Sequence, residues 1–98
     1  MSFAITLHPD LAAEINQAKM WYDAEQPGLG AVFDTELFDR FQFIADNPFV
    51  FAVFQKDIRL ARIKQFPYVI LYRVEDSIIR ILAVVHSARR LNKWLKRR

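Results

Sequence analysis

Two long apolar segments, separated by only three polar residues, place the strongest constraint on the fold of this chain. Residues 68–74 read YVILYRV and residues 78–85 read IIRILAVV, and their β-branched and aromatic side chains favour strands. The intervening Glu75-Asp76-Ser77 is typical of the connection in a β-hairpin. Because both segments are apolar almost throughout, we expect two neighbouring strands that are buried on most of both faces.

Two helices are predicted ahead of this hairpin. The first begins at His8-Pro9-Asp10, because proline suits the first turn of a helix and an acid there interacts favourably with the helix dipole. It ends near Glu25, since Pro27-Gly28 breaks the helical pattern. The second ends at Asn47-Pro48, because the residue before a proline disfavours the helical conformation. Apolar residues recur at helical spacing in both: Leu11, Ile15, Ala18 and Tyr22, then Phe33, Leu37, Phe41 and Ile44. The tight turn between them predicts a helical hairpin.

Three further strands are expected around these elements. Residues 3–7 form a short β-branched run, residues 50–54 form a weaker candidate, and residues 58–66 alternate apolar and basic side chains. This alternation predicts one dry face and one basic face, and its slip at Ala61 indicates a β-bulge. A short terminal helix is predicted from Arg89 onward, on the spacing of three apolar residues: Leu91, Trp94 and Leu95.

The predicted fold is therefore α+β, with an N-terminal helical hairpin packed on a mainly antiparallel sheet of four to five strands and a short C-terminal helix. A length of 98 residues supports one domain, over residues 1–98. Cysteine is absent and only two histidines are present, so we expect no metal site and no cofactor. No apolar run reaches the ~18 residues of a membrane span, and the first residues do not resemble a secretion signal. We expect a cytoplasmic protein without a membrane partner.

The net charge of +3 hides an uneven distribution. Residues 1–58 carry nine acids and three bases, whereas residues 59–98 carry eleven bases and two acids. Six of those bases fall in the last ten residues. Such asymmetry indicates a polyanionic partner, either a nucleic acid or an acidic protein. The simpler interpretation is a solvated basic tail.

Several short motifs, in this order and at these separations, resemble the RelE/ParE superfamily of toxins from bacterial type II toxin–antitoxin pairs. The resemblance runs from about Leu7 to Trp94. Its most specific parts are Trp21-Tyr22, Pro27-Gly28-Leu29-Gly30, Asn47-Pro48, Phe66-Pro67-Tyr68 and the stretch from His86 to Arg90.

The resemblance implies one of two activities. RelE-like members are mRNA interferases that usually cut in the ribosomal A site, whereas ParE-like members bind and poison DNA gyrase and are not nucleases. Both are held inactive by a cognate antitoxin that wraps the toxin, and such pairs are associated with plasmid stabilization. The basic half of this chain predicts an acidic, partly disordered antitoxin that becomes ordered on binding.

Metal-independent RNA cleavage would need an acid or base near the 2′-hydroxyl and cations at the developing charge. His86 is the one side chain beside the basic cluster that titrates near neutrality, and Trp94 is suited to stacking on a base. The resemblance places basic residues on the middle strands and after the last strand at corresponding positions. The catalytic candidates are His86, Arg89 and Lys64, and the RNA-binding candidates are Arg59, Arg62, Arg90 and Trp94.

Two departures from the nuclease pattern weaken this assignment. Residues 68–72 contain no arginine where nucleases often carry one, and Trp94 replaces a terminal tyrosine but cannot transfer a proton. Structural roles compete with the functional ones: His86 as a partner of the backbone at a strand end, Trp94 as a packing residue, and Trp21 and Tyr22 as core or inter-helix residues, one of them buried.

Three classes of function remain after the sequence has been considered. The preferred one is a toxin that arrests growth by ribosome-dependent mRNA cleavage, as an endoribonuclease. The alternative is a non-enzymatic inhibitor of DNA gyrase, for which the helical hairpin rich in aromatic residues supplies a binding surface. A plain nucleic-acid-binding module ranks last, because no known reader motif is present.

Overall fold

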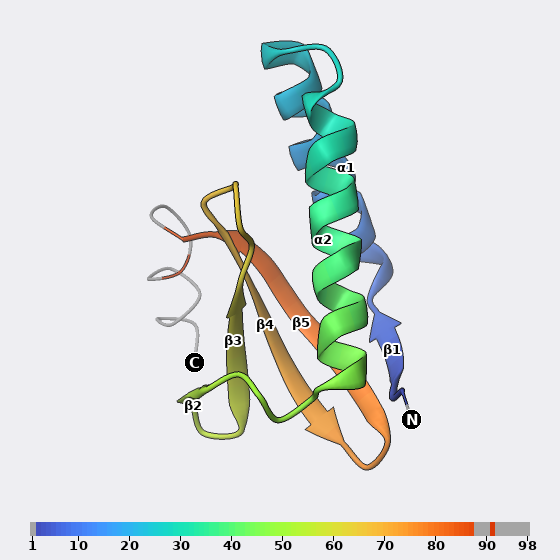
Figure 1. The fold of residues 1–98 in the computed structure, drawn as a ribbon, viewed down its shortest axis with the longest axis vertical. Helices are drawn as coiled ribbons and strands as arrows, with labels where there is room; N and C mark the ends of the chain where they lie inside the picture. Colours follow the sequence, from blue (N-terminus) through green and yellow to red (C-terminus); the bar gives the residue numbers. More distant parts are fainter. Residues whose placement is uncertain (1, 88–90, 92–98) are drawn as a thin grey trace.

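The computed structural model describes residues 2–87 and Leu91, which form two helices and a five-stranded sheet (Figure 1). The elements follow the order β1 (Ala4–Leu7), α1 (Pro9–Glu25), α2 (Leu29–Asp46), β2 (Val53–Gln55), β3 (Ile58–Arg62), β4 (Tyr68–Glu75) and β5 (Ile78–His86). The α+β fold predicted from the sequence is confirmed. The predicted terminal helix falls almost entirely outside the described residues.

The sheet is mixed, with strand order β1-β5-β4-β3-β2. β1 runs parallel to β5, whereas the other neighbouring strands are antiparallel. The central hairpin of β4 and β5 is therefore flanked by β3 on one side and by the N-terminal strand on the other. Both helices lie on one face of this sheet, and the end of the helical hairpin extends beyond the sheet (Figure 1).

The helix-facing side of the sheet forms the larger apolar cluster, which we call the helix-side cluster. Its apolar stripe on α2 is fully or almost fully buried, as the helical spacing predicts. The helices contribute Leu11, Ile15, Phe33, Leu37, Phe41 and Ile44, and the strands and their connections contribute Ala61, Ile63, Phe66, Ile70, Tyr72, Ile79, Ile81 and Val84.

The opposite side of the sheet is also apolar and forms a second cluster, the far-side cluster. Its buried members are Ile58, Val69, Leu71, Ala83 and Val85, and the partly buried Phe54, Leu60, Leu82 and Leu91 pack against them. β4 and β5 thus bury side chains on both faces, which confirms the expectation from their sequence.

A register shift lies in β5 rather than at Ala61. β3 pairs with β4 without interruption from Ile58 to Arg62, whereas Leu71 faces Ala83 and Tyr72 faces Ile81, which leaves Leu82 as an extra residue. The predicted bulge at Ala61 is therefore wrong. Ala61 interrupts the alternation of apolar and basic residues in the sequence because its small side chain is buried in the helix-side cluster. The predicted division of β3 into a dry and a basic face is also wrong, because apolar side chains of this strand enter both clusters.

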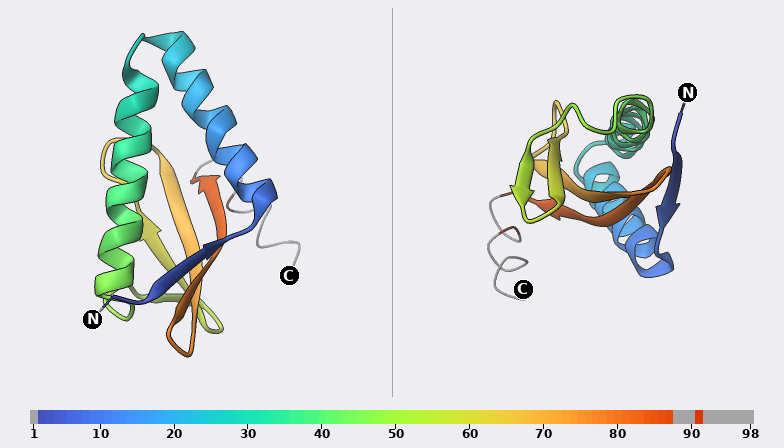
Figure 2. Two further views of the ribbon diagram at one scale, coloured as in Figure 1. Left: turned by 90° about the vertical axis from the view of Figure 1, so that its right-hand side faces the viewer. Right: turned by 90° about the horizontal axis from the view of Figure 1, so that it is seen from below.

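The helical hairpin turns around the carboxylate of Asp23. Asp23 Oδ1 accepts hydrogen bonds from the backbone N–H groups of Gly28, at 3.0 Å, and Gly30, at 3.2 Å. Gly28 precedes α2 with a φ of 91°, a conformation that favours glycine. Gly30 allows the helices to approach closely, because a Cβ at this position would lie 2.5 Å from the carbonyl oxygen of Lys19. From this turn the two helices spread apart toward their other ends (Figure 2).

Tyr72 ties the sheet to the segment after α2. Its ring is fully buried in β4, and its hydroxyl donates a hydrogen bond to the carbonyl oxygen of Pro48 at 2.8 Å. Burial raises the pKa of Tyr72 above its ordinary value of 10.0, because it penalises the phenolate, and the nearby charge of Arg59 opposes this effect.

Replacement of Gly30 by alanine should destabilise the protein. We expect Gly30→Ala to lower the free energy of unfolding by about 1–3 kcal/mol, because the added methyl group forces α1 and α2 apart. Urea unfolding followed by circular dichroism measures this loss. The control is Ala31→Ser at the neighbouring exposed position, which should stay within about 0.5 kcal/mol of the parent. Equal stabilities for Gly30→Ala and the parent would contradict the close helix approach.

Tyr72→Phe should lower the free energy of unfolding at neutral pH by about 1 kcal/mol, because it removes the hydrogen bond to Pro48. The raised pKa means that the tyrosine contributes stability below its ordinary pKa of 10.0 and loses that contribution as the pH rises through the folded-state value. The difference between parent and variant should therefore shrink in strongly alkaline buffer. Urea unfolding at a series of pH values tests this, and a difference that stays constant with pH would contradict it.

Candidate functional site

The four sequence-predicted site residues that the structure describes are divided among different elements. His86 ends β5, Arg59 and Arg62 lie on β3, and Lys64 lies in the connection between β3 and β4. Arg89, Arg90 and Trp94 lie outside the described residues, so their predicted roles stay predictions.

Arg59 has a structural partner on the segment that follows α2. Its guanidinium donates hydrogen bonds to the carbonyl oxygens of Phe49, at 3.3 Å, and Phe51, at 2.6 Å. The same group lies 5.3 Å from the centre of the Phe49 ring, within the range of a cation–π interaction. Through these two hydrogen bonds to the backbone, Arg59 stabilises the segment that leads into β2.

Arg62 and Lys64 are exposed and line two adjacent hollows that share Arg40 of α2. The hollow with Lys64 measures about 360 Å³ and also contains Glu36, Asp39, Phe43 and Gln65. The hollow with Arg62 measures about 510 Å³ and also contains Phe51, Ala52, Val53, Phe54 and Leu60.

Arg40 joins the two hollows through the aromatic rings beside it. Its guanidinium carbon lies 5.7 Å from the centre of the Phe43 ring and 5.5 Å from that of Phe51. We call Arg40, Arg62 and Lys64 the cationic patch. Arg40 was not among the residues predicted from the sequence. The sequence feature that could have indicated it is that Arg40 is the only basic residue of the second predicted helix.

His86 lies in a different pocket, between α1 and the ends of β4 and β5. Its ring makes an edge contact with Tyr68, at a centroid distance of 5.5 Å, and the two residues are paired in the sheet register. The pocket measures about 200 Å³. Its described lining residues are Glu14, Gln17, Ala18, Trp21, Tyr22, Tyr68, Val84 and His86, none of which is Lys or Arg.

The separation of His86 from Lys64 bears on RNA cleavage. A proton-transferring group and a charge-stabilising cation must reach the same phosphate. The pocket of His86 and the hollow of Lys64 share no described residue. His86 and Lys64 thus line different pockets among the described residues, and their predicted joint role in catalysis stays a prediction.

Trp21 and Tyr22 differ in their surroundings. Tyr22 is half-buried and packs its ring against Phe33 and Phe66, with centroid distances of 5.3 and 4.7 Å. Trp21 is 54% exposed. The expectation that one of the two packs inside is met by Tyr22, because adjacent helical residues point about 100° apart and only one of them faces the sheet. Trp21 is not a core residue.

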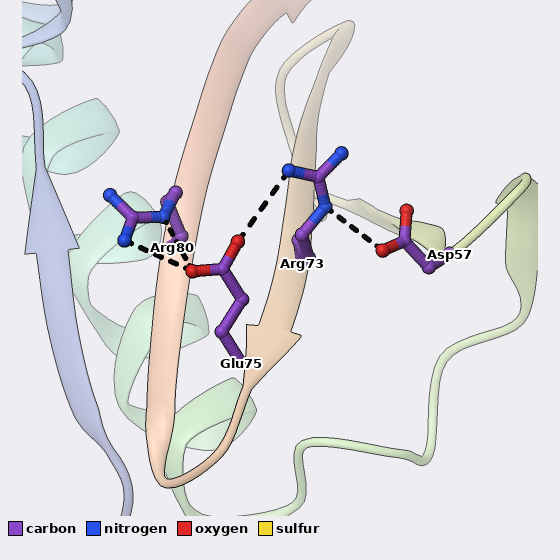
Figure 3. A network of polar contacts seen from close by, with 4 residues as sticks. All are labelled: Asp57, Arg73, Glu75 and Arg80. Atoms are coloured by element: carbon purple, nitrogen blue, oxygen red, sulfur yellow. Dashed lines mark hydrogen bonds and ion pairs between the residues drawn. The ribbon is translucent and has the colours of Figure 1, made fainter.

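Two other basic residues of the C-terminal half are neutralised by acids at one end of the sheet (Figure 3). Arg80 holds the carboxylate of Glu75 at 3.0 Å, and Arg73 lies 3.5 Å from the same carboxylate and 3.0 Å from that of Asp57. The hydrogen bond from Arg80 is the main cause that lowers the pKa of Glu75 below its ordinary value. Arg73 and Arg80 therefore add little to a surface for polyanions.

The described part of the chain contains no group of three His, Asp or Glu residues that could hold a metal ion. Neither of the helices in residues 2–87 is long and apolar enough to cross a membrane.

Comparison with known proteins identifies a family and a similar solved fold. A sequence model described as the ParE toxin of the type II toxin–antitoxin system parDE matches residues 5–91. The fold is similar to that of a solved structure described as the chromosomal ParDE toxin–antitoxin system from P. aeruginosa, with a TM-score of 0.75 and 13% sequence identity over 87% of this chain and 96% of that chain. At this identity the second likeness establishes the fold alone. A search of curated proteins found no significant match.

The family match covers both helices and all five strands, and it includes the Trp21-Tyr22, Phe66-Pro67-Tyr68 and His86 motifs on which the resemblance was based. The chain belongs to the ParE toxin family of type II toxin–antitoxin systems.

Proposed function

We propose that this protein arrests growth by binding DNA gyrase and carries out no chemical step of its own. Inhibition of gyrase is the activity implied by the ParE branch of the superfamily, and gyrase is a cytoplasmic target. The observation that carries the proposal is the separation of His86 and Lys64 into pockets with no described residue in common. A binding toxin needs no such pair, whereas a metal-independent nuclease does.

Cleavage of mRNA is the second candidate, and the cationic patch is the observation in its favour. Arg62 and Lys64 are exposed and form no ion pair with another described residue, so phosphate groups could approach them. Electrostatic attraction of this kind supports binding of a polyanion without specifying a reaction. The patch by itself therefore accounts for affinity and not for catalysis.

A cognate antitoxin is the other partner that a ParDE system implies. The cationic patch, with the apolar side chains of Phe43, Val53 and Phe54 beside it, is suited to an acidic segment that carries apolar anchors. This surface supports the proposal of an acidic, partly disordered antitoxin, because charges of opposite sign increase the rate and specificity of association.

The choice between the two activities can be tested on the same preparation. We expect the purified protein to block DNA supercoiling by gyrase. Brief induction in cells should stop growth without new cuts in mRNA mapped by primer extension. The half-inhibitory concentration of the double variant Arg62→Ala/Lys64→Ala against gyrase should stay within about threefold of the parent's value. A threefold change corresponds to a difference below about 1 kcal/mol.

The opposite pattern would overturn the proposal. New mRNA cuts on induction, their loss in the double variant and unaffected supercoiling would together assign the protein to the nuclease class. Circular dichroism serves as the control that the double variant is folded.

A further inference from the structure

Half of the described residues that line the pocket between α1 and the ends of β4 and β5 carry aromatic rings. Trp21 and Tyr22 meet nearly at right angles with centroids 5.1 Å apart, and Tyr22 and Tyr68 meet at 67° with centroids 6.2 Å apart. Tyr68 in turn meets His86 at 70°. These neighbouring rings therefore meet edge to face and together form a continuous aromatic wall of the pocket.

The size of the pocket limits what it accepts. Its volume of about 200 Å³ is below the roughly 300–1,000 Å³ typical of small-molecule and cofactor sites. It is suited to one protruding side chain of a partner protein. Trp21 lines this pocket and is exposed, so such a side chain could contact its ring.

The charges around the pocket select a cation. Glu14 lines it together with the neutral Gln17, and its described lining contains no Lys or Arg. The whole hairpin from residue 9 to residue 46 carries eight acids and two bases. One of those bases, Lys19, is paired with Asp34 at 3.5 Å, and the other, Arg40, packs against Phe43 and Phe51 beside the cationic patch. Among the described lining residues, Glu14 is therefore the one acid, and its carboxylate favours a cationic ligand over an anionic one.

We infer that this pocket receives one arginine side chain from a basic surface of a partner protein. A guanidinium group stacks on aromatic faces and pairs with a carboxylate, so the rings and Glu14 recognise different parts of the same group. The inference rests on the proposed function only for the identity of the partner, which would then be gyrase. A DNA-handling enzyme carries basic surfaces of this chemistry, because it has to bind a polyanion.

The chemistry of the pocket can be tested without any partner. N-acetyl-arginine amide is titrated into the isotope-labelled full chain, and the indole N–H signal of Trp21 is followed by NMR, with Trp94→Phe used to assign it. We expect a saturable shift that is lost in Glu14→Gln. N-acetyl-citrulline amide, which has the same shape without the charge, should cause no shift. An equal response to citrulline, or a stronger one to N-acetyl-leucine amide or adenosine, would overturn the inference.

The link to the partner is tested in the supercoiling assay. Glu14→Gln and Trp21→Ala should each raise the half-inhibitory concentration about tenfold, which corresponds to 1.4 kcal/mol. The matched controls are Glu25→Gln and Met20→Ala, which alter exposed residues of α1 outside the pocket and should have no effect.

The two proposals fail in different ways. If the parent inhibits gyrase and the pocket variants inhibit it equally well, the pocket is not the contact and the proposed function stands. If the parent does not inhibit gyrase, the proposed function is wrong, and the arginine titration alone decides whether the pocket binds a guanidinium group.

Discussion

Burial of both faces of β4 and β5 is the constraint on which the rest of the structure depends. Val69, Ile70, Leu71 and Tyr72 are four consecutive residues of β4 and all are fully buried. Because successive side chains of a strand point to opposite faces, two layers must cover this strand. The helices supply one layer, and Phe54, Leu60, Leu82 and Leu91 belong to the other. In β4 and β5 the polar side chains consequently lie within three residues of a strand end, as His86, Glu75 and Arg73 do.

Much of this architecture could be predicted from apolar spacing, because the sequence periods of the helices and of the central strands are clear. The bulge in β5 could not, since a near-continuous apolar run does not show where its alternation changes phase. An extra residue at Leu82 sends Ile81 and Val84 toward the helices and Ala83 toward the far-side cluster. In β3 the error had the opposite origin: a small buried residue, Ala61, looked like an irregularity in an otherwise regular strand.

The candidate site was harder to predict than the fold because the partners of charged residues come from distant parts of the chain. Arg59 donates hydrogen bonds to carbonyl groups eight and ten residues earlier, and Arg73 of β4 forms an ion pair with Asp57, which directly precedes the neighbouring strand β3. Nothing in a local pattern distinguishes these arginines from the exposed Arg62. For Trp21 and Tyr22 the helix geometry predicted that one of the two is buried, but the sequence did not show which of them faces the sheet.

The charge asymmetry of the sequence becomes two distinct surfaces in the structure. The acidic helical hairpin carries the aromatic pocket, and the cationic patch lies where α2 approaches β3. A toxin must bind both an antitoxin and a target. If its two binding surfaces carry opposite charges, the surface that binds the antitoxin disfavours the target, and the surface that binds the target disfavours the antitoxin. Glu14 disfavours an acidic antitoxin at the pocket, whereas Arg62 and Arg40 disfavour a basic target at the hollow between α2 and β3. On this argument the antitoxin prevents target binding through its bulk rather than by filling the aromatic pocket, so substitutions in the pocket should separate the two interactions.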